Sequence, residues 1–293
     1  MNKRSAPSVW LSLAPAITII GILFGVSVLY GLAQSFGVLT GSGQQTINLE
    51  AYRNVFAGQG PAGREFWSSF GFSIWIAGIS TFFSAIGGFF VAVWLNSRQS
   101  KGSRVDTLAL NWNLAFPHLV WAIGLLLFFS QSGLLARVFA AMGFIETPGE
   151  FPVLVRDRLG VGIIVDYISK EIPFLALIVL AVLRSQAENF EVVAENLGAS
   201  RWQRLRYVTI PQVLPSLMSG SLLVFAFIFS AYEVPALLGV RYPRMLPVLA
   251  LEFFNNPDLN SRAEGMVISL AITMLVMLVA AVSIRFEKKL GDQ

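Results

Sequence analysis

The chain is dominated by continuous apolar runs of about 20 residues, the length that a helix needs to cross a hydrocarbon core of roughly 30 Å. These runs recur along the whole of its 293 residues. Lipid offers no hydrogen-bond partners to bare backbone groups, so only helices and closed barrels cross it. Because the runs are continuous rather than alternating, they lack the pattern of barrel strands. The sequence therefore predicts an all-α, polytopic membrane protein.

The composition supports a membrane protein over a soluble one. Hydrophobic residues make up 55% of the chain and charged residues 13%, whereas an average soluble domain has roughly 25% charged residues. The net charge of +4 does not indicate nucleic acid, because basic residues gather in short segments between apolar runs, as membrane topology requires. We therefore expect membrane lipid, and no nucleic acid, as a partner. The chain has no cysteine, which excludes a disulfide framework, a thiolate zinc site and a cysteine nucleophile.

Six of the apolar runs are long enough to span the membrane, and we expect residues 1–293 to form a single transmembrane domain. The predicted spans are Trp10 to Leu32, Trp67 to Leu95, Leu108 to Ser130, Val161 to Leu183, Val213 to Leu237 and Met266 to Ile284. An even number of spans puts both termini on one side. Within the second span we expect close helix packing at the small residues Gly71, Gly78, Gly87 and Gly88.

The distribution of basic residues predicts that both termini are cytoplasmic. The segments that lie on the same side of the membrane as the termini are short and hold most of the basic residues. An excess of basic residues in short segments marks the cytoplasmic side of a membrane protein. They are Lys3, Arg4, Arg98, Lys101, Arg104, Arg184, Arg201, Arg204, Arg206, Arg285, Lys288 and Lys289. The first apolar run is too long for the core of a signal peptide, so we expect an uncleaved helix. Long outer loops at residues 33–66 and 131–160 offer surfaces to an external partner.

The longest inner segment, residues 184–216, has the pattern of two short helices joined at a glycine. Residues Glu188 to Leu197 allow a short amphipathic helix that Gly198 can end, because glycine adopts the left-handed conformation of a helix C-terminus without steric cost. Ser200 can cap a second helix from Arg201 to Tyr207. We therefore expect an elbow between the fourth and fifth spans that projects into the cytoplasm.

The spacing of residues around this elbow resembles a known signature. Residues 192–194 are Val-Val-Ala, Gly198 follows after three residues, and Val208, Ile210 and Pro211 follow after nine more. This arrangement resembles the cytoplasmic signature of permease subunits of ATP-binding-cassette (ABC) importers, a Glu-Ala-Ala stretch, three residues, a glycine, nine residues and Ile-x-Leu-Pro. Because proline interrupts helices, we expect Pro211 to end the elbow unit.

The match departs from the family pattern at the leading glutamate. Glu191 lies one position before the triplet and Glu195 directly after it, so either can supply that charge. The run from Gly198 to Trp202 also resembles the family. Residues 66–284, as a five-helix unit around the elbow, resemble the spermidine and putrescine permeases and their relatives for iron, sulfate, thiamine and phosphonate. The resemblance therefore implies a type I ABC importer permease of the bacterial inner membrane.

In that family the elbow is a coupling helix, which docks in a groove of a separate ATPase subunit. The resemblance implies two such ATPase subunits, which bind ATP and magnesium, a second permease subunit, and a solute-binding protein on the outer side. The permease itself would hold no cofactor. An apolar, aromatic tip beside arginines suits such docking, while an interfacial helix on lipid headgroups is the alternative. The candidate coupling residues are Glu191, Ala194, Glu195, Leu197, Gly198, Ala199, Ser200, Trp202, Arg204 and Pro211.

Charged residues inside a span are costly and usually face a pathway or a partner. Asp166, Lys170 and Glu171 lie in the outer half of the fourth span. Asp166 and Lys170 are four residues apart, so they can form a self-neutralising pair on one helical face. A place on the solute path is the alternative for all three.

Polar residues near the ends of two other spans are further candidates. Asn111 and Asn113 lie near the start of the third span, where Pro117 can expose backbone carbonyls to a water-filled cavity. Near the outer end of the fifth span, Tyr232 and Glu233 can hold a cationic solute. Glu233 can equally cap a helix or contact the partner permease. The candidate solute-path residues are Asn111, Asn113, Asp166, Lys170, Glu171, Tyr232 and Glu233.

The sequence contains no catalytic motif. It has no GxxxxGK[ST], HExxH or GxSxG pattern and a single histidine, so we expect neither catalytic residues nor a metal site, and ATP hydrolysis by other subunits. The predicted function is an ABC importer permease for a small polar solute, a polyamine first, with phosphonate, sulfate, iron and thiamine as alternatives. A secondary transporter driven by an ion gradient is the alternative class, but such proteins usually show paired repeats, and none is visible.

Overall fold

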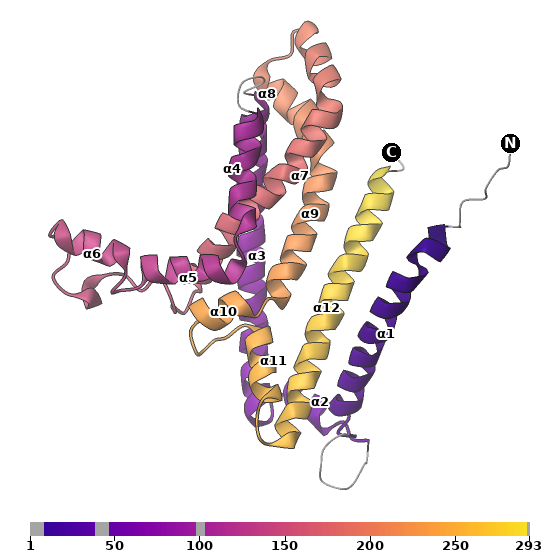
Figure 1. The fold of residues 1–293 in the computed structure, drawn as a ribbon, viewed down its shortest axis with the longest axis vertical. Helices are drawn as coiled ribbons and strands as arrows, with labels where there is room; N and C mark the ends of the chain where they lie inside the picture. Colours follow the sequence, from indigo (N-terminus) through magenta and orange to yellow (C-terminus); the bar gives the residue numbers. More distant parts are fainter. Residues whose placement is uncertain (1–8, 39–46, 98–102, 292–293) are drawn as a thin grey trace. The chain divides into compact units, whose positions relative to one another are not determined.

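The computed structural model describes residues 9–38, 47–97 and 103–291, and every regular element in these ranges is helical. This confirms the predicted all-α class (Figure 1). The elements are α1 (Val9–Ser35), α2 (Glu50–Phe56), α3 (Gly60–Ser97), α4 (Ser103–Ala115), α5 (His118–Phe129), α6 (Leu134–Ala141), the 3₁₀ turn η1 (Pro148–Glu150), α7 (Val161–Asn196), α8 (Arg201–Arg204), the π-helix η2 (Leu205–Thr209), α9 (Ile210–Ser230), α10 (Glu233–Leu238), α11 (Leu246–Phe254) and α12 (Leu259–Gly291).

Five segments of the described chain are long and apolar enough to cross a membrane. They are Leu13–Ser35, Gly60–Ser97, His118–Ala141, Arg201–Ser230 and Ser261–Arg285. The remaining predicted span lies in α7, which has 36 residues but carries Asp166, Lys170 and Glu171, so its composition is less apolar. The prediction of six crossings therefore stays a prediction, and it depends on α7.

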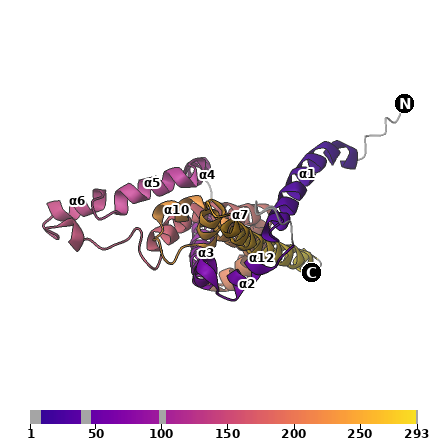
Figure 2. The same cartoon turned by 90° about the horizontal axis from the view of Figure 1, so that it is seen from below.

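The predicted third span is wrong as a single helix. α4 ends at Ala115 and α5 begins at His118, because Pro117 has no N–H to continue the helical hydrogen bonds and its ring disfavours helical conformation in the residue before it. Figure 1 shows α5 leaving α4 at a large angle, and both views show α5 followed by α6 in nearly the same direction (Figures 1 and 2). The apolar run is therefore divided between two helices with different directions.

The predicted fifth span also ends early. α9 stops at Ser230, and Ala231 has an extended conformation with φ −73° and ψ 136°. In a continuous helix the Ala231 carbonyl would accept a hydrogen bond from the N–H of residue 235. Residue 235 is a proline, which has no N–H to donate. Residues up to Leu237 consequently belong to a separate short helix, α10.

The chain divides into two compact units. The first contains Met1–Phe66 and Ala250–Ala271, and the second contains Trp67–Leu249 and Ile272–Gln293. In the first unit, the predicted outer loop 33–66 contains α2, where the Asn54 amide donates to a Glu264 carboxylate oxygen at 3.0 Å. The Phe56 and Phe66 rings also pack edge to face at 5.3 Å.

Helix α7 is central to the second unit, where it packs on α4, α5, α9 and α10. A buried apolar cluster joins α3, α4, α7 and α9. Its members are Ala92, Leu95, Leu110, Ala176, Val179, Leu180, Leu183 and Val213. The second unit contains both the predicted elbow and the predicted solute-path residues.

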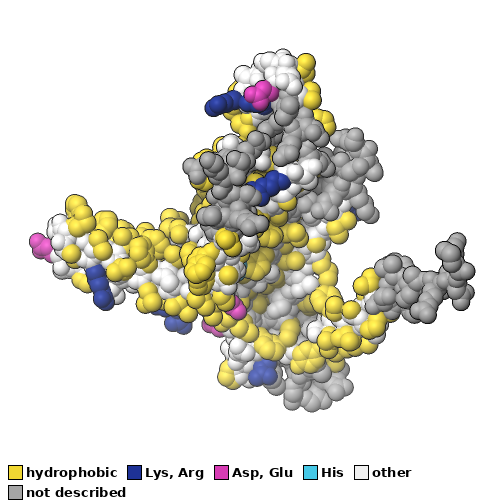
Figure 3. Space-filling model, turned by 45° about the horizontal axis from the view of Figure 1, so that its top comes forward, with side chains coloured by type: hydrophobic (Ala, Val, Ile, Leu, Met, Phe, Trp, Pro, Cys, Tyr) yellow, Lys and Arg dark blue, Asp and Glu magenta, His cyan; other side chains and the backbone are white. Residues whose placement is uncertain are grey.

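Large apolar side chains remain exposed on helices of both units. They include Leu23 and Leu29 on α1, Phe90 on α3 and Leu127 on α5. Figure 3 shows hydrophobic side chains over much of the described surface and charged ones in a few places. A surface of this kind is expected where lipid or other apolar chains replace water.

Candidate functional site

The elbow is built on a left-handed glycine at the end of α7. Gly198 has φ 80°, and its N–H donates to the Glu195 carbonyl at 2.9 Å, while the Ala199 N–H donates to the Ala194 carbonyl at 3.0 Å. These two bonds form a Schellman motif, which satisfies the last carbonyls of a helix. The structure therefore confirms the predicted role of Gly198 as the end of the first arm.

The second arm begins with a capping box. The Ser200 hydroxyl accepts from the Gln203 N–H at 3.3 Å, and the Gln203 side chain accepts from the Ser200 N–H at 2.8 Å. Across the bend, an Arg204 guanidinium nitrogen lies 2.6 Å from a Glu195 carboxylate oxygen. The predicted cap at Ser200 is confirmed. Hydrogen bonds on both sides of Gly198, with this ion pair between the arms, hold the elbow in one shape.

The tip of the elbow is exposed and apolar. Leu197 and Trp202 are 82% and 64% exposed, while Ala194 and Ala199 are half-buried. Arg204 is mainly occupied by Glu195, with its side chain 20% exposed. The side chain of Glu191 lies outside the described residues. A rigid turn with an exposed leucine and tryptophan is a suitable docking element for a protein groove.

Two details of the predicted elbow are wrong. The first arm is not a separate short helix, because α7 continues without interruption to Asn196. Pro211 does not end the unit, because it lies in the first turn of α9, where a missing N–H is tolerated. The second arm passes from α8 through η2 into α9. Each arm is therefore continuous with a long helix, the first with α7 and the second with α9.

A second polar site joins α7 to the break between α4 and α5. The Lys170 ammonium donates to the carbonyl oxygens of Asn113 at 2.6 Å and Phe116 at 2.7 Å. In a continuous helix the Asn113 carbonyl would accept from an N–H at position 117, which proline lacks, and here it accepts from the Phe116 N–H at 3.3 Å as well as from Lys170. Lys170 thus replaces the lost donor, and its positive charge lies at the negative end of α4.

Both residues adjoining Lys170 also contact α5. The Trp121 indole N–H donates to the Ser169 hydroxyl at 2.8 Å, and His118 Nε2 lies 3.7 Å from a Glu171 carboxylate oxygen. Three consecutive side chains therefore hold the broken helix against α7. Ser169 and Trp121 are not among the predicted site residues, because no sequence signal pairs an indole N–H with a hydroxyl 48 residues away.

The predicted Asp166–Lys170 ion pair is not formed. Lys170 is 2% exposed and donates to α4, while Asp166 is fully buried at 0% exposure. Neither carboxylate oxygen of Asp166 has a hydrogen-bond partner within the described part of the chain. The hydroxyl of the neighbouring Tyr167 is also buried, and it also has no hydrogen-bond partner among the described residues.

An open cavity of about 310 Å³ adjoins this site. It is lined by Leu114, His118, Lys170, Glu171, Phe174, Leu223, Val224 and Phe227. The structure therefore brings Lys170 and Glu171 to one cavity, with Asn113 bonded to Lys170. Asn111, Tyr232 and Glu233 are instead exposed on α4 and at the start of α10. No group of three His, Cys, Asp or Glu residues able to hold a metal ion occurs among the described residues.

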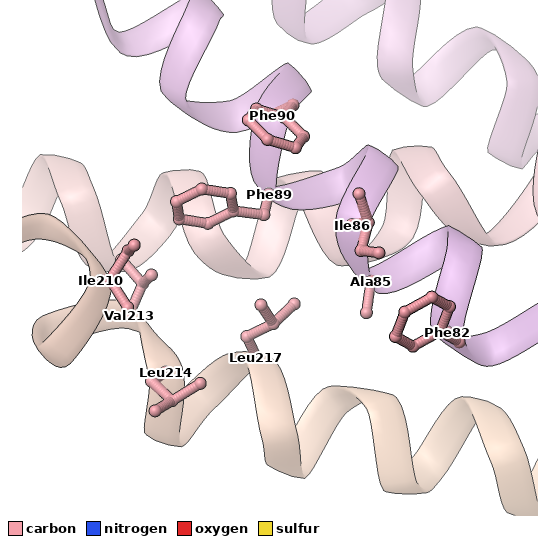
Figure 4. Close-up of a pocket in the computed structure, with 9 residues that line it drawn as sticks. All are labelled: Phe82, Ala85, Ile86, Phe89, Phe90, Ile210, Val213, Leu214 and Leu217. Carbon is pink, nitrogen blue, oxygen red and sulfur yellow. The ribbon is translucent and has the colours of Figure 1, made fainter. Parts of the chain in front are cut away.

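Another cavity, between α3 and α9, has only apolar side chains around it. Phe82, Ile86 and Phe89 of α3 face Leu214 and Leu217 of α9 across it (Figure 4). Its volume is about 270 Å³. With no polar group on its wall, it cannot orient a polar solute, so we place the candidate solute path at the Lys170 cavity.

Long apolar helices, a rigid exposed elbow and a polar cavity among buried helices define a membrane transport protein. Residues 88–288 match the family described as "Binding-protein-dependent transport system inner membrane component", and the chain belongs to this family. It is accordingly a multi-pass protein of the inner membrane, in a family of transport permeases.

Two relatives and one solved structure agree with this assignment. "Inner membrane ABC transporter permease protein YnjC" of Escherichia coli (strain K12) is 31% identical over 206 residues, 69% of this chain and 38% of that protein. "Molybdate/tungstate transport system permease protein WtpB" of Thermococcus kodakarensis is 32% identical over 169 residues, 57% of this chain and 58% of that protein. The chain thus spans less than two thirds of either relative.

The fold is also found in a solved transporter. A chain from the "Crystal structure of a bacterial ABC transporter involved in the import of the acidic polysaccharide alginate" superposes with a TM-score of 0.69 and 17% identity. The match covers 95% of this chain and 99% of that chain. At this identity, the similarity supports the type I permease fold alone.

Proposed function

We propose that this chain is a membrane-spanning permease subunit of an ATP-driven importer, and that its elbow couples an ATPase to the transport path. The elbow carries the proposal, because it is rigid, exposes Leu197 and Trp202, and continues into α7 and α9. Movement of a docked ATPase would therefore be transmitted to α7 and α9, two of the four helices that line the Lys170 cavity.

The partners follow from this role. Two ATPase subunits would bind ATP and magnesium, since this chain has no phosphate-binding loop. A second permease, the same or different, would complete the pathway, and a solute-binding protein would dock on the outer loops. We place both termini in the cytoplasm on the distribution of basic residues.

The solute is a separate proposal. A polyamine was expected from the spermidine and putrescine resemblance and from Glu233, but Glu233 is exposed at the start of α10 and does not line the Lys170 cavity. The Thermococcus kodakarensis relative is named for molybdate and tungstate. We therefore propose a small oxyanion rather than a polyamine. Uptake of labelled molybdate, sulfate and spermidine by proteoliposomes containing the whole transporter distinguishes these cargoes.

Co-purification tests the coupling role. The tagged chain, solubilised from its native membrane, is expected to bring down an ATPase subunit, and a Gly198→Val variant to lose it while remaining in the membrane. Gly143→Val is a matched control, because Gly143 also has a left-handed conformation, with φ 76°, and open space around it. A chain that purifies alone and transports without ATP would instead be a secondary transporter.

A further inference from the structure

Two buried titratable side chains on α7, Asp166 and Lys170, stand one turn apart, and only Lys170 has hydrogen-bond partners within the described residues. Lys170 donates to the backbone carbonyl of Asn113 in α4 and to that of Phe116 in the break between α4 and α5. Asp166 is fully buried, and its carboxylate has no partner within the described ranges. An unpaired buried carboxylate opposes folding, so stability alone does not explain its presence. Side chains four residues apart lie on the same face of a helix, which puts Asp166 within reach of the Lys170 ammonium.

We propose that the Lys170 ammonium alternates between two sets of acceptors, and that Asp166 is the second one. In this structure Lys170 binds the Asn113 and Phe116 carbonyls. In another state of the transport cycle it binds Asp166, and the break between α4 and α5 is released from α7. Asp166 is thus a positioning residue, which acts on the solute path through Lys170. The inference rests on the proposed function, because a transport cycle supplies the two states.

The two arrangements are chemically comparable. In the first, the ammonium makes two charge-assisted hydrogen bonds, and in the second it forms an ion pair with a carboxylate that is otherwise unpaired. Neither arrangement satisfies every group, since Asp166 is unpaired in the first, and in the second the Phe116 carbonyl loses the Lys170 donor while the Asn113 carbonyl keeps only the Phe116 N–H at 3.3 Å. A pair of states with similar energy is what a switch requires.

The exchange of Lys170 between its two sets of acceptors takes place at the wall of the cavity. Lys170 lines the cavity together with Leu114 of α4 and His118 of α5. When Lys170 leaves, the Phe116 carbonyl needs water or solute as a new donor, because lipid supplies none, and the Asn113 carbonyl keeps only its bond from the Phe116 N–H. Release of Lys170 therefore accompanies entry of water or solute between α4, α5 and α7. The Ser169–Trp121 and Glu171–His118 contacts remain as the other tethers.

The decisive variant is Asp166→Asn in the complete transporter. If Asp166 is the second acceptor, the neutral amide traps Lys170 on α4, so ATP-dependent transport falls on the order of tenfold or more. The thermal unfolding temperature stays the same or rises, because an unpaired buried charge is removed. Tyr167→Phe is the matched control, since it removes the adjacent buried, unpartnered hydroxyl, and it should transport like the wild type. A lowered unfolding temperature in Asp166→Asn, or unimpaired transport, would overturn the inference.

A distance measurement tests the movement itself. The chain has no cysteine, so spin labels can be placed at Leu108→Cys on α4 and Ala181→Cys on α7, both exposed. We expect the α4–α7 distance to change between nucleotide states in the wild type and in Tyr167→Phe, but not in Asp166→Asn. A wild-type change that Asp166→Asn retains refutes the exchange. A wild type that neither hydrolyses ATP nor transports with it refutes the proposed function instead.

Discussion

At the residue scale, the elbow depends on one backbone conformation at Gly198. With φ 80° and no atom within 4 Å of a built Cβ, the position has room for a side chain but has a conformation that L-residues seldom adopt. A left-handed residue costs roughly 1–2 kcal/mol when a Cβ is present, and asparagine tolerates it better than most. Conformation and size can therefore be separated experimentally.

Substitutions at Gly198 should be ranked by their tolerance of this conformation. We expect Gly198→Asn to retain most ATP-dependent transport, Gly198→Ala to lose part of it, and Gly198→Val to lose nearly all, because a β-branched residue is poorest in the left-handed region. Transport by proteoliposomes containing the ATPase measures this order. If Asn fails as completely as Val, then the ATPase groove requires the small size of glycine, and the conformational explanation is wrong.

Local features at this scale could be predicted from the sequence, but tertiary ones could not. Gly198 ending a helix and Ser200 capping the next depend on neighbours within a few residues, and both are confirmed. The partners of Lys170 lie 57 and 54 residues away in sequence, so the nearby Asp166 was the only visible candidate. The helix break at Pro117 contributes to this outcome, because the Asn113 carbonyl has no N–H at position 117 to accept from and binds Lys170 beside the Phe116 N–H.

At the scale of elements, glycines set how closely α3 approaches α7. A Cβ added to Gly87 would lie 2.6 Å from the Ile172 Cδ1 atom, and one added to Gly88 would lie 2.8 Å from the Leu175 Cβ atom. Gly71 and Gly78 have no atom within 4 Å of such a Cβ. The prediction of close packing therefore holds for two of the four glycines, because helical spacing alone does not show which part of a helix meets a neighbour.

Substituting Gly88 should destabilise the helix pair. Gly88→Val places methyl groups against the Leu175 Cβ and the backbone of α7, and overpacking of this kind costs about 1–3 kcal/mol. We expect a lower thermal unfolding temperature for the purified protein in detergent. Gly78→Val, on the same helix with open space, is the control and should change it little. An equal shift in both variants would show that valine acts through the helix itself and not through contact with α7.

The predicted span boundaries agree with the structure at the start of the fourth span and differ from it in the third and fifth spans. The start of the fourth span at Val161 coincides with the start of α7, where Gly160 has a left-handed φ of 72°. The third and fifth spans were predicted as straight runs because hydropathy continues across Pro117 and Pro235. Hydropathy measures only burial in lipid, whereas the helix ends depend on which carbonyl each proline leaves without a donor.

At the scale of the whole molecule, the topology depends on whether α7 crosses the membrane. Its 36 residues correspond to about 54 Å at 1.5 Å per residue, well beyond a core of roughly 30 Å. Both Asp166 and Lys170 are buried within the protein, and Lys170 is bonded to the Asn113 and Phe116 carbonyls rather than facing lipid, which lowers the cost of inserting α7. If α7 crosses the membrane, the chain crosses six times and both termini lie on the same side of the membrane. If α7 does not cross, the chain crosses five times and the termini lie on opposite sides.

Cysteine labelling decides between these topologies. The chain has no cysteine, so Gly149→Cys, before α7, and Leu197→Cys, at the elbow, each give a single reactive thiol at an exposed position. In intact cells with the outer membrane made permeable, a membrane-impermeant maleimide should label Gly149→Cys at once. It should label Leu197→Cys only after the inner membrane is opened, because the elbow faces the cytoplasmic ATPase. Labelling of both thiols before the inner membrane is opened would mean that α7 does not cross, and the elbow would then lie outside, where no cytoplasmic ATPase can reach it.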